Sequence, residues 1–204
     1  AAWKGRNVQQ DVCQTKLEVL KMTGDQKIRS ELDLLIRLCR LDFSAEHAES
    51  LKALLSDVND WDYFACMANA HGAGALAYFN LEKLGLLGKL PEKQSGFLKN
   101  IFTLNLARNT SHFSRMKEVL NILNNAGIKT VLLKGLALEL TVFGNRGLRQ
   151  MTDVDVLIAR HECIRSRKLL LDAGFRSLPL KSPVHKLIIS HTGKHLPSLL
   201  KGDF

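Results

Sequence analysis

Apolar residues recur at helical spacing through much of the chain, and this pattern predicts a series of amphipathic helices. Four of these helices are expected to begin near Ser30, Ser44, Asp60 and Ala73. Serine and aspartate are favoured residues at helix starts, and Gly72 is a stop signal after the third helix. The first half of the chain is therefore expected to be helical.

The longest helical pattern follows Pro91, a residue that suits the first turn of a helix. Its apolar positions continue toward Gly127, which would make this helix longer than most. We therefore expect a kink or break near Asn109. Residues 1–28 are mixed and polar and are expected to form a leader or a loose first helix.

After Gly127 the spacing changes from helical to strand-like. Residues 128–133 form a short run of β-branched and leucine side chains, which is typical of a strand. Residues 137–143 carry helix formers, residues 144–147 form a glycine-containing loop, and residues 153–159 alternate as a second strand does. This order predicts a small α/β core built on a mixed sheet.

These elements indicate an α+β protein, in which residues 29–126 form a helical region and residues 127–204 form the core. The composition, 46% hydrophobic and 24% charged, is that of a globular protein. No apolar run approaches the roughly 20 residues of a membrane span. The four cysteines are far apart and form no Cys-x-x-Cys pair, which favours reduced thiols in a cytoplasmic protein.

Asp153 and Asp155 fall on one face of the second predicted strand. At roughly 3.3 Å per residue their side chains start about 6.6 Å apart, and two anions at that distance repel by about 2.5 kcal/mol in an effective dielectric near 20. A divalent cation relieves this repulsion. The alternative is an edge strand with a solvated polar face, where water screens the repulsion to under about 1 kcal/mol.

The residues around the two aspartates favour a site for a metal-bound triphosphate. Gly135 stands between the first strand and a helix, where backbone and ligand can approach closely and free N–H groups suit a phosphate. Lys134 and Arg149 supply positive charge for the same anion. Carboxylate oxygens are ligands that Mg²⁺ prefers.

The motif Leu-Lys-Gly-x-Ala-Leu, then an arginine four residues before Asp-Val-Asp-Val-Leu-Ile, resembles the uncharacterised nucleotidyltransferase family of the DNA polymerase β-like superfamily. The resemblance covers about residues 127–176. It implies that Gly135 holds the phosphates of a nucleoside triphosphate such as ATP and that Asp153 and Asp155 bind two Mg²⁺ ions. It also implies transfer of a nucleoside monophosphate to a hydroxyl of a protein, a small molecule or RNA.

The chain departs from the superfamily pattern in two places. Gly135 is followed by Leu136, where many superfamily members have a glycine or serine. A third carboxylate is expected on a strand that would follow Phe204, so the core is expected to be incomplete at that end, and Asp203 is the only late candidate. These departures keep open a module that binds a nucleotide or a protein partner without catalysis.

The formal net charge of +9 is concentrated in the second part of the chain. Residues 134–204 hold 12 basic and 6 acidic side chains, a net charge of +6. This excess suits an anionic substrate near the predicted site. It also leaves a third interpretation, a basic helical protein that binds nucleic acid without a metal.

Overall fold

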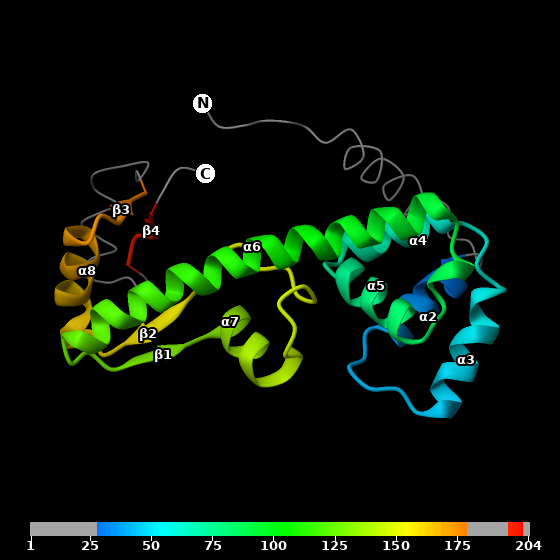
Figure 1. Cartoon of the computed structure of the whole chain (residues 1–204), viewed down its shortest axis with the longest axis horizontal. Coiled ribbons are helices and arrows are strands. Elements are labelled where there is room, and N and C mark those ends of the chain that lie inside the picture. Colours follow the sequence, from blue (N-terminus) through cyan, green and yellow to red (C-terminus); the bar gives the residue numbers. More distant parts are fainter. Residues whose placement is uncertain (1–27, 179–195, 202–204) are drawn as a thin grey trace. The chain divides into compact units, whose positions relative to one another are not determined.

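The computed structural model describes residues 28–178 and 196–201, and these residues are mostly helical (Figure 1). The α-helices are α2 (Ile28–Leu38), α3 (Ala45–Leu55), α4 (Trp61–Ala70), α5 (Gly74–Lys83), α6 (Glu92–Asn125), α7 (Lys134–Leu138) and α8 (Cys163–Asp172). The short helical segments are η1 (Leu87–Lys89), η2 (Glu139–Phe143) and η3 (Arg160–Glu162). The strands are β1 (Thr130–Leu132), β2 (Val156–Ile158), β3 (Arg176–Ser177) and β4 (Leu199–Leu200).

The chain divides into two compact units. The first unit contains residues 1–111 and 135–153, and the second contains residues 112–134 and 154–204. Helix α6 contributes its first part to one unit and its last part to the other. The chain therefore passes between the units twice within the region that the sequence predicts to be the site.

The helices of the first unit begin where the sequence predicts. Ser44 caps α3 by accepting the His47 N–H at 3.2 Å, and Asp60 caps α4 by accepting the Tyr63 N–H at 2.8 Å. The buried Glu31 side chain accepts the N–H groups of Asn59 and Asp60, which fixes the start of α4 from α2. The core consists of apolar side chains from α2 to α5 and the start of α6, with Leu34, Leu38, Leu51, Phe64, Leu81 and Leu98 fully buried.

The predicted break of α6 near Asn109 is wrong, because the helix runs from Glu92 to Asn125 without interruption. An asparagine inside a helix weakens it by competing for local backbone groups. Here the Asn109 side chain is fully buried, and its Nδ2 donates instead to the carbonyl oxygens of Arg146 and Arg149 at 2.6 and 2.7 Å. Asn109 therefore fastens the loop that precedes Asp153 to the first part of α6.

The same loop packs against α6 through Gly147, and this contact gives a stability prediction. A Cβ at Gly147 would overlap the Phe102 ring, with 2.6 Å to Cζ and 2.8 Å to Cδ2. We expect Gly147→Ala to lower the free energy of unfolding by about 1–3 kcal/mol, because the ring or the loop must shift. Urea denaturation measures this change.

Gly96→Ala is the matched control for Gly147→Ala. A Cβ at Gly96, inside α6, meets nothing within 4 Å, so this variant should be more stable than the wild type by about 0.5–1 kcal/mol. Equal effects of the two alanines would show that Gly147 is not held against Phe102.

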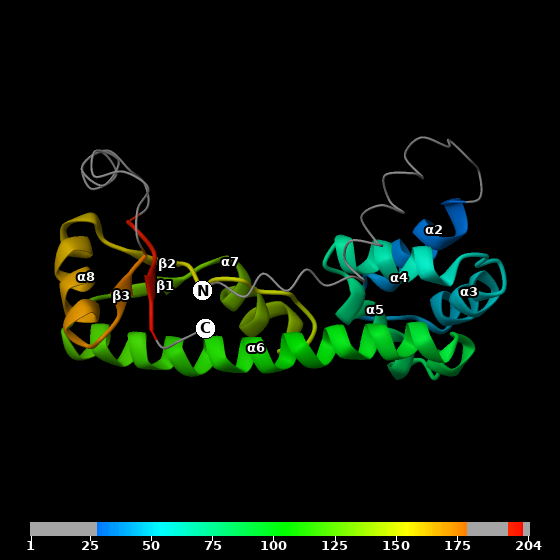
Figure 2. The same ribbon diagram turned by 90° about the horizontal axis from the view of Figure 1, so that it is seen from above.

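The strands of the second unit form antiparallel pairs. Strand β1 pairs with β2, with Val131 opposite Leu157, and Figure 2 shows these two strands side by side. Strand β3 pairs separately with β4. The α+β class is confirmed, but the described strands form two two-stranded antiparallel sheets and no mixed sheet.

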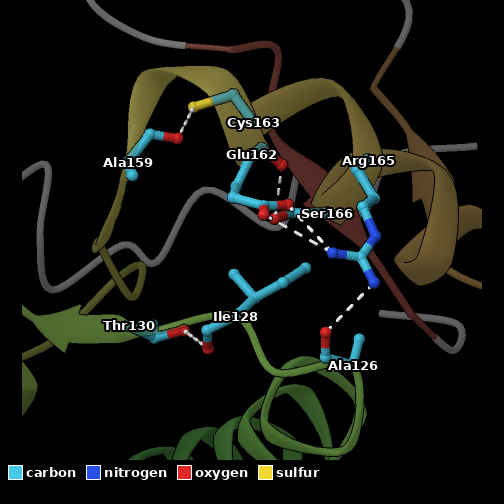
Figure 3. A network of polar contacts seen from close by, with 8 residues as sticks. All are labelled: Ala126, Ile128, Thr130, Ala159, Glu162, Cys163, Arg165 and Ser166. Atoms are coloured by element: carbon cyan, nitrogen blue, oxygen red, sulfur yellow. Dashed lines mark hydrogen bonds and ion pairs between the residues drawn. The ribbon is translucent and has the colours of Figure 1, made fainter.

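Polar contacts around Arg165 tie the start of α8 to the end of α6 (Figure 3). Arg165 Nη2 donates to the Ala126 carbonyl at 3.1 Å, and its Nη1 lies 3.3 Å from Glu162 Oε2. Ser166 Oγ donates to the Glu162 carbonyl at 2.7 Å. Arg167 on the same helix donates to the Pro197 carbonyl at 2.6 Å. Two of the basic side chains of α8 are therefore part of the packing of this unit.

The expectation of four reduced cysteines is wrong for Cys66, which is disulfide-bonded. Cys39 and Cys163 carry free thiols. Within residues 28–178 and 196–201, no helix is both long enough and apolar enough to cross a membrane. Helix α6 is long, but charged side chains recur along it.

Candidate functional site

The turn after β1 brings Lys134 to Asp155 within the second unit. Lys134 Nζ lies 2.6 Å from Asp155 Oδ2, and the backbone N–H of Leu133 donates to the Asp155 carbonyl at 3.0 Å. The Lys134 side chain is 68% exposed and the Asp155 side chain 28% exposed. A cation is therefore held against one of the two predicted metal-binding carboxylates.

Lys134 adopts an uncommon backbone conformation, with φ of +48°. The left-handed region costs a residue with a side chain roughly 1–2 kcal/mol, and glycine avoids this cost. Among the described residues Lys134 alone adopts positive φ without being glycine. The protein therefore keeps a strained lysine at the point where β1 turns into α7, and such strain is concentrated at functional sites.

Gly135 lies in the first unit and is covered on one side by that unit's own side chains. A Cβ at Gly135 would be 2.8 Å from Met151 Sδ and 3.0 Å from Arg149 Nη1. Only glycine permits this close approach of the arginine and the methionine. The structure thus brings Gly135 and Arg149 together, as two of the predicted site residues.

Arg149 is held from both its backbone and its side chain. Its carbonyl oxygen accepts from Asn109 Nδ2 at 2.7 Å. Its Nη1 is buried and has no hydrogen-bond partner among the residues that the structure describes. The guanidinium group therefore packs closely against Gly135.

The two aspartates precede β2, which begins at Val156, whereas the sequence predicted a strand that contains them. The Asp153 side chain is exposed, and its Oδ1 accepts a long hydrogen bond of 3.4 Å from the neighbouring Thr152 Oγ1. Asp155 continues the pairing of β1 with β2 through its carbonyl. Both carboxylates lie on one short extended stretch, two residues apart in the chain.

A third carboxylate at this site is not seen in the described part of the chain. Residues 28–178 and 196–201 contain no group of three His, Cys, Asp or Glu side chains that could hold a metal ion. Asp203 lies outside the described residues, so the prediction about it is not tested.

Sequence reasoning missed Glu139, one helical turn after Gly135. Its side chain is 2% exposed, and neither carboxylate oxygen has a hydrogen-bond partner among the described residues. Burial raises the pKa of Glu139 above its usual value, while the Asn145 N–H and the guanidinium groups of Arg146 and Arg149 act in the opposite direction. The signal in the sequence was a single acidic residue inside an otherwise apolar helix.

The raised pKa of Glu139 predicts how stability depends on pH. Folding favours the protonated carboxyl, so the free energy of unfolding of the wild type should fall as the pH rises above the ordinary value of 4.5 and through the folded-state pKa. Glu139→Gln removes this fall. We therefore expect the free energy of unfolding of Glu139→Gln, relative to that of the wild type, to increase between about pH 4 and about pH 7. Urea denaturation at these pH values measures it. A shift in favour of the wild type would contradict the assignment.

A known family model covers the five predicted site residues. The model of a family described as uncharacterised nucleotidyltransferase matches residues 57–197, a stretch that includes Lys134, Gly135, Arg149, Asp153 and Asp155. No curated protein and no solved structure matches the chain. Because the matched stretch covers more than half of the chain and contains every predicted site residue, the chain belongs to the uncharacterised nucleotidyltransferase family.

Proposed function

We propose that this protein transfers a nucleoside monophosphate from a nucleoside triphosphate to a hydroxyl acceptor, with Mg²⁺ as cofactor. Membership of a nucleotidyltransferase family supports nucleotidyl transfer in general. The observation that carries the proposal is the ion pair of Lys134 with Asp155, 2.6 Å long, at the turn after β1. It sets a cation, which the sequence assigns to the triphosphate, against a carboxylate to which the family resemblance gives the metal.

The chemistry of the donor set fits Mg²⁺. Asp153 and Asp155 offer carboxylate oxygens, which this ion prefers. Asp153 is exposed and forms no ion pair within the described residues, while Asp155 already carries a cationic partner in Lys134. Both carboxylates are thus suited to hold a cation. A bound Mg²⁺ would supply neutralisation of the phosphate charge and activation of the acceptor hydroxyl.

Lys134, Gly135 and Arg149 would hold the triphosphate. The exposed Lys134 ammonium would neutralise phosphate charge, and Gly135 leaves room for the Arg149 guanidinium to lie at the same turn, where it would meet the same phosphates. The planar guanidinium of Arg149 would donate to two phosphate oxygens at once. The protein would then act by positioning and charge compensation, and no side chain is required as a nucleophile.

A second candidate function is binding of a nucleotide or a protein partner without chemistry. Two observations favour it: the described residues contain no group of three metal-binding side chains, and Leu136 follows Gly135 where a hydroxyl-bearing residue is common in the superfamily. Two carboxylates hold a metal less firmly than three and do less to activate an attacking hydroxyl.

Incubation of the chain with each of the four nucleoside triphosphates, labelled at the α-phosphate, separates these functions. The acceptors tested are the chain itself, small-molecule alcohols and RNA, each with Mg²⁺ or with a chelator. Mg²⁺-dependent transfer of the label with release of pyrophosphate supports the enzyme. Mg²⁺-dependent binding without any transfer or pyrophosphate release supports the binding module.

A further inference from the structure

Two neighbouring residues tie the turn after β1 to Asp155. The backbone N–H of Leu133 donates to the Asp155 carbonyl at 3.0 Å, which extends the pairing of β1 with β2 one step beyond Leu132 and Val156. The next residue, Lys134, places its Nζ 2.6 Å from Asp155 Oδ2. Both Lys134 and Asp155 belong to the second unit. A backbone hydrogen bond and an ion pair therefore hold this aspartate against the turn.

The ion pair depends on the uncommon backbone of Lys134. Leu133 lies opposite Asp155 in the antiparallel pairing, so these two side chains share one face of the strands. In a continued strand the next side chain would point to the opposite face, away from the Asp155 carboxylate. Lys134 instead has φ of +48°, and its ammonium reaches Oδ2. Glycine would adopt this conformation without strain, so the lysine side chain is kept here at a cost, which indicates a task.

Lys134 and Mg²⁺ compete for the same carboxylate. Mg²⁺ binds a carboxylate oxygen at about 2.1 Å. The Lys134 ammonium, 2.6 Å from Asp155 Oδ2, therefore repels a divalent cation that approaches this carboxylate. The Lys134 side chain is 68% exposed, and a long, exposed side chain changes rotamer quickly without repacking a core. The lysine is thus the partner that can move, while the backbone of Asp155 stays paired with Leu133.

A nucleoside triphosphate changes this competition, because it brings negative charge for both cations. Free Mg²⁺ offers the Lys134 ammonium no new partner, so its binding to Asp155 breaks the ion pair without replacement. A complex of Mg²⁺ with a triphosphate offers phosphate oxygens, with which a lysine ammonium pairs as a point charge. Lys134 can then exchange a carboxylate for a phosphate by a movement of its side chain alone.

We propose that Lys134 determines which form of the metal the site accepts: its ammonium keeps free Mg²⁺ off Asp155 and shifts to a phosphate oxygen when Mg²⁺ arrives bound to a nucleoside triphosphate. This inference rests on the function proposed above. It gives Lys134 two successive partners, Asp155 and the triphosphate. Removal of the ammonium therefore has opposite effects on the two ligands, because free metal binds more tightly and nucleotide binds more weakly.

Mn²⁺ is the probe for the test, because it takes the same oxygen ligands as Mg²⁺ and its electron paramagnetic resonance signal reports the free ion. Titration of the whole chain with Mn²⁺ alone should show an affinity about tenfold higher in Lys134→Met than in the wild type. Isothermal titration with ATP, GTP, CTP and UTP in excess Mn²⁺ should show the reverse. Each nucleotide that the wild type binds should bind about tenfold more weakly to Lys134→Met.

Two further variants of Lys134 and a matched control keep the test specific. Lys134→Gly removes the charge and also the backbone strain, and it should show the same two opposite effects. Lys134→Arg keeps a cation and should behave as the wild type. Lys129→Met is the matched control, since Lys129 is an exposed lysine just before β1 and its loss changes the net charge equally. It should leave both affinities unchanged.

A double variant tests whether Asp155 is the partner of Lys134 in this exchange. Without the carboxylate, loss of the lysine should no longer tighten metal binding. Lys134→Met/Asp155→Asn should therefore bind Mn²⁺ as weakly as Asp155→Asn alone. Tighter binding of Mn²⁺ by the double variant than by Asp155→Asn would show that the lysine acts elsewhere and would overturn the exchange.

The outcomes separate the exchange from the function on which it rests. An affinity for Mn²⁺ that is equal or lower in Lys134→Met, or that rises equally in Lys129→Met, would overturn the exchange. Nucleotide binding as tight in Lys134→Met as in the wild type would do the same, and in each case a wild type that binds nucleotide leaves the proposed function standing. A wild-type chain that binds none of the four nucleotides would overturn the proposed function, and the exchange with it.

Discussion

Asp153→Asn and Asp155→Asn are each expected to reduce nucleotidyl transfer on the order of 10²-fold or more, which is the scale of losing one charged group that stabilises a transition state. Asparagine keeps the shape of aspartate but offers one neutral oxygen in place of a carboxylate, so it binds Mg²⁺ far more weakly. Transfer of α-labelled nucleotide at saturating Mg²⁺, the assay described above, measures the loss.

The fold should survive these substitutions. Asp153 is exposed, and the ion pair between Asp155 and the largely exposed Lys134 is of a kind that contributes about 0–1 kcal/mol. Asp172→Asn, at an exposed carboxylate at the end of α8, is the matched control and should keep full activity. Unchanged activity in Asp153→Asn, or its failure to fold, would refute the assignment of these carboxylates.

Asn109→Asp is expected to lower the free energy of unfolding by about 3–5 kcal/mol at neutral pH, the cost of an uncompensated buried charge. Asn109 is fully buried, and its Nδ2 donates to two backbone carbonyls at 2.6 and 2.7 Å. An ionised aspartate donates nothing and places a negative charge against both carbonyl oxygens. The loop that carries Arg146 and Arg149 would lose its attachment to α6.

Urea denaturation at neutral and acidic pH measures the effect of Asn109→Asp. Burial favours the protonated aspartic acid, which can still donate one hydrogen bond, so the loss of stability should be smaller at acidic pH. The control Asn121→Asp changes an exposed residue of the same helix and should leave stability within about 0.5 kcal/mol. Equal losses in the two variants would show that the Asn109 contacts do not anchor the loop.

The helices were predictable because their signals are local. Ser44 and Asp60 each cap a helix by accepting an N–H only three residues away, and Gly72 ends α4 with a positive φ. The pairing of Lys134 with Gly135, and the spacing from Arg149 to the aspartates, are also local in sequence. These features could be read from residue type and spacing alone.

The contacts that shape the site could not be predicted, because they join residues distant in sequence. Asn109 Nδ2 donates to carbonyls 37 and 40 residues away, so this amide group is occupied outside the helix, and the helix continues where composition suggested a break. The packing of Arg149 on Gly135 and the burial of Glu139 depend on how the loop returns to α7. No periodicity in a single sequence encodes such a return.

The second predicted strand was too long for a related reason. Alternation of polar and apolar residues begins at Asp153, but a strand requires a partner. Strand β1 has three residues, Thr130–Leu132, and therefore pairs only with Val156–Ile158. Beyond Leu133 the chain turns at the strained Lys134, which leaves the two aspartates before β2.

Isothermal titration of the purified chain with the four nucleoside triphosphates, with and without Mg²⁺, tests the central claim most directly. The double variant Asp153→Asn/Asp155→Asn is titrated alongside. Binding of at least one nucleotide that requires Mg²⁺ and is lost in the double variant is the predicted result. Equal binding by both proteins, or binding indifferent to Mg²⁺, would contradict a metal-dependent nucleotide site at Asp153 and Asp155.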